Sequence, residues 1–337
     1  MSSRVAVVGT GTWGTTLALL LADTGRHVVL WARTAQEAEE LRTARENKAF
    51  LPGVKFPDNL TVTDSVEEAA RGCKLVLLVV PAQTMRRNVI IVRDALEKGV
   101  VVVSAAKGVE IGSGKRMSEV VTEELTAAQQ TKVAVLSGPN LAREIVEGKP
   151  ATTVVAAQDS DTASFVAESL MSPNFRVYTN PDVAGVELGG ALKNIYALGA
   201  GIGDGLGVGD NAKAAFITRG LAEMARLGVA MGANPLTFAG LAGLGDLVAT
   251  CASKHSRNRY VGEELAKGRK LPEIQASMRM VAEGVTTTEA ALNLAGRYGV
   301  EMPIAELMHR VLFENVSPRE AIVQLMTREP KNEFYGI

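Results

Sequence analysis

The first half of the chain alternates apolar runs with stretches of helical periodicity. Because parallel neighbouring strands need long crossover connections, this alternation predicts an α/β domain with a doubly wound parallel sheet. Strands are expected within RVAVVG (4–9), HVVLWAR (27–33), KLVLLVVP (74–81), VVVVSAAKG (100–108), KVAVLSG (132–138), ATTVVAAQ (151–158) and FRVYTN (175–180). Helices are expected within TTLALLLADTG (15–25), TAQEAEELRTARE (34–46), MSEVVTEELT (117–126) and DTASFVAESLM (161–171).

The second half has helical periodicity without further β-branched runs, which predicts an all-α domain. The expected division is therefore 1–179 and 180–337, with Asn180 as an N-cap and Pro181 at the first helical position. The Gly-dense segment 199–211 is expected to be a loop or a sharply bent connection. Helices are expected within 180–201, 211–232, 288–299 and 305–314, with another start at Ser317-Pro318.

Two capping signals support the helices of the first half. Thr34 and Ser65 are each followed three residues later by a glutamate, Glu37 and Glu68. In this pattern the hydroxyl accepts a hydrogen bond from an N–H of the first turn and the carboxylate reaches back to the cap. Both segments are therefore expected to begin helices.

Length and charge narrow the classes of partner. With 337 residues, 47% of them hydrophobic, the chain can bury a large core and its length suggests two domains. Its formal net charge of -1 excludes the strong basic field that holds nucleic acid or an anionic membrane. Its apolar runs fall far short of the roughly 20 residues that a membrane-spanning helix needs. Small molecules are the expected partners.

The N-terminus and the cysteines predict a cytoplasmic protein. The sequence MSSRVAVVG enters a strand without a basic region and an apolar export segment. Cys73 and Cys251 belong to no paired metal or redox motif, which fits a reducing compartment. With three histidines that form no cluster with Cys or Asp, no transition-metal site is expected.

A glycine-rich turn follows the first expected strand. Gly9, Gly11 and Gly14 have G-x-G-x-x-G spacing directly after an apolar strand and at the start of a helix. The first glycine permits the tight turn, the second lets a pyrophosphate approach the backbone, and the third lets helix and strand pack closely. In this context the motif predicts a Rossmann-like dinucleotide-binding domain.

The residue after the second strand bears on the choice of nucleotide. Domains that prefer NAD carry an acidic residue near this point, whereas here the strand ends in Arg33. A guanidinium can bind a 2′-phosphate with two hydrogen bonds, so Arg33 favours NADP(H) and leaves NAD(H) open. A solvated cation, or one that stacks on adenine, is the alternative interpretation of Arg33.

One lysine lies in an apolar, small-residue helix. In ELGGALKNIYALGAG (187–201), Lys193 falls on the face formed by glycines and alanines, opposite a stripe that includes Leu188 and Leu192. Small neighbours let a ligand or another backbone come close, and desolvation lowers a lysine pKa towards a value useful in proton transfer. Alternatively, the side chain extends to the surface from a helix packed through its leucines.

Further blocks, in order, complete a pattern. Lys107 follows an expected strand in VVSAAKGVE (102–110), and LSGPNLAREI (136–145) forms another strand-to-helix junction. Polar residues gather in GLGDLVATCASKHSRNRYVGEEL (243–265). Together with GTGTWGT (9–15), ELGGALKN (187–194) and VAEG (281–284), these blocks make the whole chain resemble the bacterial-type NAD(P)-dependent glycerol-3-phosphate dehydrogenases.

The resemblance implies roles for individual residues. Lys193 is the proton acceptor on the substrate hydroxyl, and Asp246 orients that lysine or binds a substrate hydroxyl. Substrate contacts are implied for Lys107, Gly138, Asn140, Lys193, Asp246, Ser256, Arg257 and Asn258. With the glycine motif, dinucleotide contacts are implied for Gly9, Gly11, Thr12, Trp13, Gly14, Arg33, Lys107, Ala142, Arg257, Val281 and Glu283. After SGP the family usually has Ser or Thr, whereas this chain has Asn140.

The resemblance also implies an activity, with alternatives. It implies interconversion of sn-glycerol 3-phosphate and dihydroxyacetone phosphate, supply of glycerol 3-phosphate for glycerophospholipid synthesis, and a homodimer. A β-hydroxyacid dehydrogenase with the same two domains is the alternative enzyme, although Lys107, Ser256, Arg257 and Asn258 suit a phosphate better than a carboxylate. A regulatory protein that senses NAD(P) without catalysis would not need Lys193.

Overall fold

A computed structural model describes residues 4–125, 130–278 and 280–333. The chain divides into two compact units, one formed by Met1–Ala106 and Met117–Val183, the other by Lys107–Arg116 and Ala184–Ile337. The helical unit therefore includes a segment, 107–116, that interrupts the first unit in sequence. The hydropathy pattern does not reveal this insertion, because the segment belongs to neither a regular strand nor a helix.

The first unit contains an eight-stranded sheet in the order β3-β2-β1-β4-β5-β6-β7-β8. Six of the seven strand pairs are parallel, and the α/β fold class is confirmed. Strand order reverses at β1 and β4, which is where such sheets bind ligands. The strands are β1 (Arg4–Val8), β2 (His27–Trp31), β3 (Leu60–Thr63), β4 (Cys73–Leu78), β5 (Val101–Ser104), β6 (Lys132–Ser137), β7 (Ala151–Ala156) and β8 (Phe175–Asn180).

One strand pair departs from the parallel expectation. Strands β6 and β7 are antiparallel, with Val135 opposite Ala156. The connection between them contains only a five-residue helix, α6 (Ala142–Val146). Such a helix rises about 7.5 Å, whereas a six-residue strand spans about 20 Å, so the connection is too short to cross the sheet and return in parallel.

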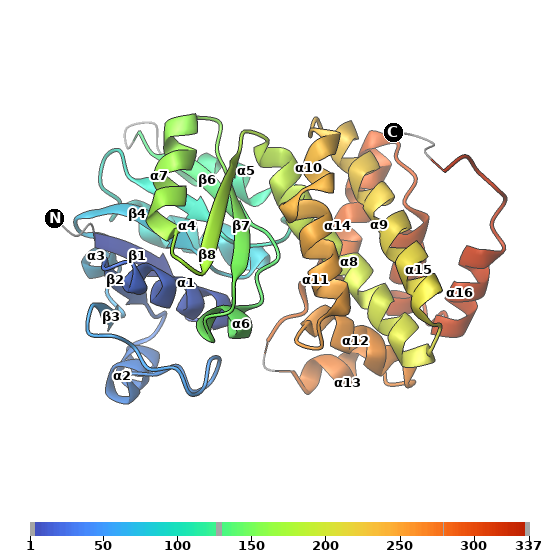
Figure 1. Cartoon of the computed structure of the whole chain (residues 1–337), viewed down its shortest axis with the longest axis horizontal. Coiled ribbons are helices and arrows are strands. Elements are labelled where there is room, and N and C mark those ends of the chain that lie inside the picture. Colours follow the sequence, from blue (N-terminus) through green and yellow to red (C-terminus); the bar gives the residue numbers. More distant parts are fainter. Residues whose placement is uncertain (1–3, 126–129, 279, 334–337) are drawn as a thin grey trace. The chain divides into compact units, whose positions relative to one another are not determined.

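Helices cover both faces of the sheet (Figure 1). Alternate residues of β1 enter two apolar clusters: Val5 and Val7 pack with α1, α2, α6 and α7, and Ala6 and Val8 with α3, α4 and α5. This alternation follows from the two-residue period of a strand. The helices of this unit besides α6 are α1 (Thr12–Asp23), α2 (Ala35–Ala44), α3 (Val66–Ala70), α4 (Met85–Arg93), α5 (Met117–Glu124) and α7 (Ser160–Leu170). The predicted end of α5 at residue 126 lies outside the described residues.

The hydrogen bond predicted for the hydroxyl of each cap is confirmed. Thr34 and Ser65 accept from the backbone N–H groups of Glu37 and Glu68, at 3.2 and 3.1 Å. Contrary to the prediction, the side-chain carboxylates of Glu37 and Glu68 accept hydrogen bonds from other donors than the cap N–H groups. Glu68 accepts from the Thr63 hydroxyl at 2.5 Å, and Glu37 accepts from two groups described below. Nearby donors outside the helix therefore replace the cap N–H groups as partners.

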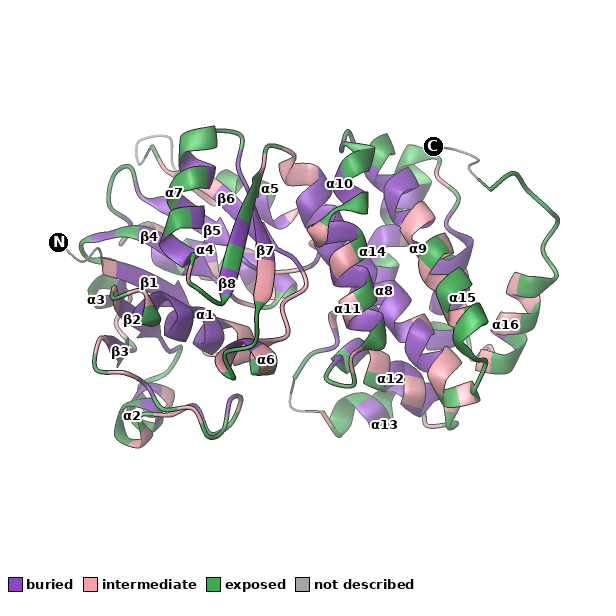
Figure 2. Cartoon of the chain, viewed as in Figure 1, coloured by how far each residue is buried: buried purple, intermediate pink, exposed green. Residues whose placement is uncertain are grey.

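The second unit is helical and contains the long helix α8 (Val183–Leu206). Figure 2 shows α8 as largely buried, and every residue from Gly185 to Leu198 is buried. Its other helices are α9 (Asp210–Ala230), α10 (Pro235–Ala239), α11 (Asp246–Ala252), α12 (Arg257–Ala266), α13 (Leu271–Ala276), α14 (Glu283–Tyr298), α15 (Pro303–Phe313) and α16 (Pro318–Met326). Among the described residues, no helix is long and apolar enough to cross a membrane.

Both ends of α8 differ from the prediction. Asn180 ends β8 instead of capping the helix, and its side chain accepts from the Asp182 N–H at 2.8 Å, so α8 begins at Val183. The Gly-dense segment is helical as far as Leu206 rather than a loop. Ser317, by contrast, accepts from the Glu320 N–H as predicted and caps α16.

The glycines of α8 are packing positions. A Cβ on Gly201 would lie 2.0 Å from the Arg259 carbonyl oxygen of α12, and one on Gly199 would lie 2.3 Å from the Phe216 ring of α9. Heavy atoms do not approach so closely, so the contact with the α12 backbone requires glycine at 201, and a side chain at 199 would displace the Phe216 ring. The helical cost of several glycines, about 1 kcal/mol each against alanine, is thus offset by tertiary packing.

Candidate active site

The loop between β1 and α1 has the geometry expected of a phosphate cradle. Gly9 has φ +116°, and a Cβ there would lie 2.4 Å from the Val79 carbonyl oxygen. A Cβ on Gly14 would lie 2.0 Å from the Gly9 carbonyl oxygen. At Gly11, by contrast, a Cβ would meet no described atom within 4 Å. The protein itself requires the first and third glycines, and the space beside the second is open to a ligand.

Three other predicted dinucleotide residues belong to this unit. Thr12 begins α1 and donates to the Phe50 carbonyl oxygen at 3.1 Å. The Trp13 indole Nε1 is buried and has no hydrogen-bond partner among the described residues. Arg33 is exposed just beyond β2, and its guanidinium forms no hydrogen bond or ion pair with the described part of the chain. An unpartnered indole N–H and an unpaired guanidinium can both donate hydrogen bonds to phosphate or ribose oxygens.

The junction after β6 is shaped by one glycine and one amide. Gly138 has φ +149°, and a Cβ there would lie 3.0 Å from the Thr153 Cα. The Asn140 amide donates to the Thr152 carbonyl oxygen at 3.0 Å and accepts from the Thr153 hydroxyl at 2.9 Å. Asn140 thereby ties this junction to β7, and Ala142 follows as the first residue of α6.

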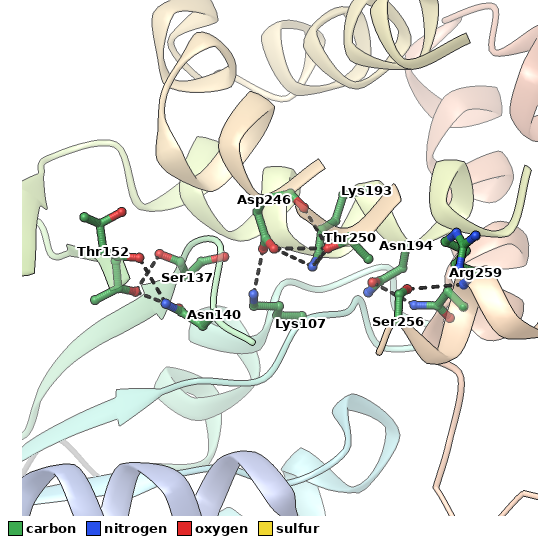
Figure 3. A network of polar contacts seen from close by, with 12 residues as sticks. Lys107, Ser137, Asn140, Thr152, Lys193, Asn194, Asp246, Thr250, Ser256 and Arg259 are labelled. Carbon is green, nitrogen blue, oxygen red and sulfur yellow. Dashed lines mark hydrogen bonds and ion pairs between the residues drawn. The ribbon is translucent and has the colours of Figure 1, made fainter. Parts of the chain in front are cut away.

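A buried ion network lies within the second unit (Figure 3). Asp246, 1% exposed, accepts from Lys193 Nζ at its Oδ1 (2.5 Å) and from Lys107 Nζ at its Oδ2 (2.6 Å). Lys193 itself is 6% exposed, so the alternative in which it extends to the surface is wrong. Two lysines from distant parts of the sequence therefore share one carboxylate.

Burial and the second lysine act on the protonation of Lys193. Removal of water lowers the pKa of Lys193 from 10.5 to about 8, against the opposing effect of the Asp246 carboxylate. The nearby positive charge of Lys107 acts in the same direction as burial and is part of the shift to about 8. A lysine with a pKa near 8 exchanges protons readily near neutral pH, as a general acid or base must.

Thr250 is a member of this network that the sequence analysis missed. Its hydroxyl accepts from Lys193 Nζ at 2.5 Å and donates to the Asp246 backbone oxygen at 2.6 Å. Thr250 lies four residues after Asp246 on α11, so both side chains lie on one helical face. That i, i+4 spacing was the available signal.

Gly189 explains how α8 reaches Asp246. A π-helical turn, η3 (Leu241–Gly245), leads directly into Asp246. A Cβ on Gly189, one helical turn before Lys193, would lie 2.6 Å from the Ala242 carbonyl oxygen of this turn. The missing side chain therefore lets the turn press against α8, and Lys193 meets the carboxylate one turn further along.

The segment 107–116 is attached to the helical unit at several points. Arg116 forms an ion pair with the buried Glu187 of α8 at 2.7 Å. Arg297 of α14 donates to the carbonyl oxygens of Ser113 and Gly112 at 2.8 and 3.2 Å. Val109 is 1% exposed within the helical core. These contacts hold the segment that carries Lys107.

The start of α12 brings together three predicted substrate residues. Ser256 caps the helix by accepting from the Arg259 N–H at 3.2 Å. Arg257 is exposed and donates to the Val281 carbonyl oxygen at 2.8 Å. Glu283, two residues later, begins α14. Predicted substrate and dinucleotide residues are thus neighbours in this part of the second unit.

Asn258 makes internal contacts. Its amide nitrogen donates to Asn194 Oδ1 at 2.9 Å, and its oxygen accepts from the Gly284 N–H at 3.0 Å. A Cβ on Gly284 would lie 2.5 Å from the Asn194 carbonyl oxygen, so this contact depends on glycine. Asn258 therefore joins α8 and α14, and Asn194 is a second residue that the sequence analysis did not assign.

Comparisons with known proteins show which family the chain matches. Residues 4–163 match the model of the NAD-dependent glycerol-3-phosphate dehydrogenase N-terminus, and residues 182–323 match that of the C-terminus. A protein of Citrifermentans bemidjiense named glycerol-3-phosphate dehydrogenase [NAD(P)+] is 53% identical, with 99% of each chain covered. Its namesake from Chlorobium phaeobacteroides is 49% identical over 98% of this chain and 99% of its own.

A solved structure is also similar along the whole chain. The crystal structure of glycerol-3-phosphate dehydrogenase from Coxiella burnetii has a TM-score of 0.93 and 37% identity, and covers 97% of this chain and 99% of its own. Identity of about one half over almost the whole length, with both family models matched, confirms the resemblance found in the sequence. The chain belongs to the family of NAD(P)-dependent glycerol-3-phosphate dehydrogenases, which are oxidoreductases acting on a CH–OH group.

Proposed function

We propose that this chain interconverts sn-glycerol 3-phosphate and dihydroxyacetone phosphate with a nicotinamide dinucleotide. The observation that carries the proposal is the buried network in which Asp246 holds both Lys193 and Lys107. Two ammonium groups beside one carboxylate leave a net positive site, which suits an anionic substrate and a developing alkoxide. Family membership supports the same substrate pair.

The proton step belongs to Lys193. When the alcohol is oxidised, neutral Lys193 takes the proton of the C2 hydroxyl; when the ketone is reduced, its ammonium form returns a proton to the C2 oxygen. Asp246 and Thr250 fix the position of Nζ through the hydrogen bonds described above. Positioned acid–base groups of this kind contribute about 10²- to 10⁴-fold to a rate.

Substrate binding is proposed for residues of both units. Arg257, an exposed residue at the start of α12, offers a forked contact to the phosphate, and Ser256 caps the same helix end. Asn258 retains one amide hydrogen beyond its bond to Asn194. Lys107 contributes a positive charge beside Lys193. Gly138 and Asn140 are proposed contacts from the first unit.

The residues of the first unit fit a dinucleotide. The open space at Gly11 and the buried, unpartnered Nε1 of Trp13 are features that a bound pyrophosphate and its ribose would use. When bound, the nicotinamide supplies the hydride acceptor or donor for C2. Arg33 supports NADP(H) as the favoured nucleotide, with NAD(H) also accepted. The further proposed contacts are Gly9, Thr12, Gly14, Lys107, Ala142, Arg257, Val281 and Glu283.

Steady-state kinetics test this proposal directly. NADPH and NADH oxidation are measured with dihydroxyacetone phosphate and, in parallel, with a panel of 3-oxo acids. We expect turnover with the phosphate, and a higher kcat/KM for NADPH. Turnover only with the acids would mean a β-hydroxyacid dehydrogenase, and tight nucleotide binding without any turnover would mean a sensor.

We further propose a cytoplasmic homodimer that supplies glycerol 3-phosphate for glycerophospholipid synthesis. The free, buried thiols of Cys73 and Cys251 suit a reducing compartment. Exposed Leu236, Val323 and Met326 in the second unit provide apolar surface for a partner copy. Light scattering during size-exclusion chromatography tests the dimer, and a monomer at micromolar concentration would contradict it.

A further inference from the structure

A carboxylate lies beside the expected adenosine end of the dinucleotide site. Glu37, in the first turn of α2, accepts a hydrogen bond from the Thr10 hydroxyl at Oε1. At Oε2 it accepts from the Arg33 backbone N–H at 3.3 Å. Thr10 lies between Gly9 and Gly11, so the carboxylate connects the glycine loop with the end of β2.

This carboxylate keeps capacity for another donor. The two oxygens of a carboxylate can accept about four hydrogen bonds, and Glu37 is only partly buried. Within the described residues neither Glu37 nor the Arg33 guanidinium forms an ion pair, so the two opposite charges are close in sequence without neutralising each other directly.

Position in the sheet gives the two charges opposite effects on nucleotide choice. In dinucleotide-binding sheets, an acid about 20 residues after the glycine motif binds the ribose 2′-hydroxyl, whereas an arginine accommodates a 2′-phosphate. Glu37 lies 23 positions after Gly14, one helical turn beyond the strand end, and its bond to the Arg33 N–H brings it back to that end. An acidic residue is thus present near the strand end, although it lies a few residues later in the sequence than usual.

We propose that Glu37 is a specificity-determining residue that counteracts Arg33. Its carboxylate accepts a hydrogen bond from the ribose 2′-hydroxyl of NAD(H) and repels the 2′-phosphate of NADP(H), so that the enzyme binds both nucleotides. This inference rests on the proposed function, because it requires the adenosine end of the nucleotide at this loop.

Nucleotide binding to two matched variants tests the proposal. Dissociation constants for NADPH and NADH are measured by calorimetry for the wild type, Glu37→Gln and Glu40→Gln. Glu40 lies on the same helix, accepts from Gln36 at 2.9 Å, and makes the same change in charge. For Glu37→Gln we expect about 10-fold tighter NADPH and about 10-fold weaker NADH, the size of a charge-assisted hydrogen bond. For Glu40→Gln we expect changes below about 2-fold for either nucleotide.

The contrary outcomes are distinct. Equal changes for both nucleotides, or no change, would show that Glu37 only supports the loop and would overturn the proposal. If Glu37→Gln does not fold, Glu37→Asp withdraws the carboxylate by one methylene, and the NADPH:NADH ratio should move in the same direction by a smaller factor; an unchanged ratio would overturn the proposal. Wild-type protein that binds neither nucleotide would instead refute the proposed function.

Discussion

Two basic side chains, Arg33 in the first unit and Lys193 in the second, have opposite environments. Arg33 is exposed and unpaired among the described residues, whereas Lys193 is buried against Asp246 and Thr250. An exposed guanidinium suits the nucleotide binding proposed for Arg33. The lowered pKa of the buried Lys193 suits the proton transfer proposed for it.

The surroundings of Arg33 and Lys193 also differ in the part of the chain that forms them. In the glycine loop near Arg33, backbone atoms and the lack of a side chain at Gly11 leave open space. The network at Lys193 is built from side chains of α8, α11 and the segment 107–116. The proposed binding loop of the first unit therefore depends on local sequence, and the proposed proton-transfer network of the second depends on tertiary packing.

Removal of the Lys193 amine should have the largest effect. For Lys193→Ala we expect kcat to fall by about 10³-fold or more, because the proposal assigns transfer of the C2 proton to this amine. Nucleotide dissociation constants should change by less than about 3-fold. Stopped-flow turnover and nucleotide titration check this, with Lys267→Ala, an exposed lysine of the same unit, as the control. Activity near the wild-type level would show that Lys193 is not the base.

Reversal of the charge at Arg33 should act on binding and discriminate between nucleotides. For Arg33→Asp we expect NADPH to bind about 10- to 100-fold more weakly, since a forked contact becomes a repulsion. The affinity for NADH should fall much less. Dissociation constants measure the difference, and Arg71→Asp, also exposed in the first unit, is the control. Equal losses for both nucleotides would indicate that Arg33 only stacks on adenine.

Substitution of two glycines of one loop should affect different properties, stability at Gly14 and nucleotide binding at Gly11. Gly14→Ala places a Cβ 2.0 Å from the Gly9 carbonyl oxygen and should lower the free energy of unfolding by about 1–3 kcal/mol or more. Gly11→Ala meets no described atom and should leave Tm nearly unchanged while nucleotide binding weakens about 10-fold. Calorimetric Tm values and nucleotide titrations check both. Unaltered binding in Gly11→Ala would mean that the open space is not the phosphate site.

The pH profile should show the smallest and most specific effect. Oxidation needs neutral Lys193, so its kcat/KM should rise as pH increases through about 8; reduction needs the ammonium form and should fall over the same range. Lys107→Gln removes a positive charge that lowers the pKa of Lys193, so both inflections should move to higher pH. Profiles for this variant and for Lys267→Gln provide the comparison. A shift to lower pH would contradict the assigned influence of Lys107.

Local features of the fold were predictable because their causes lie close together in sequence. The caps at Thr34 and Ser317 involve donors three residues away, and most strands are short, nearly continuous apolar runs. The Gly-dense end of α8 was not predictable. Its glycines look like breakers in sequence, and only contact with α9 and α12 shows why they are helical.

The candidate site divides in the same way. Sequence spacing identified Gly9, Gly11 and Gly14, and the apolar, small-residue helix singled out Lys193, to which the resemblance gave a role. Asn194 could not be found in this way, because its partner lies on another helix, whereas the i, i+4 spacing from Asp246 was the one signal for Thr250. The insertion of 107–116 into the helical unit was also hidden, since its attachment depends on Arg297 and Glu187, far along the chain.

The sequence by itself determined the two kinds of domain, the glycine motif and the family, because these depend on short periodic patterns and ordered blocks. Only the tertiary structure decided the state of Lys193. Its burial, the carboxylate 2.5 Å away and the second lysine beside it come from segments separated by many residues. A pKa depends on the charges and water around a group in space, which the neighbours of ELGGALKN along the chain do not specify.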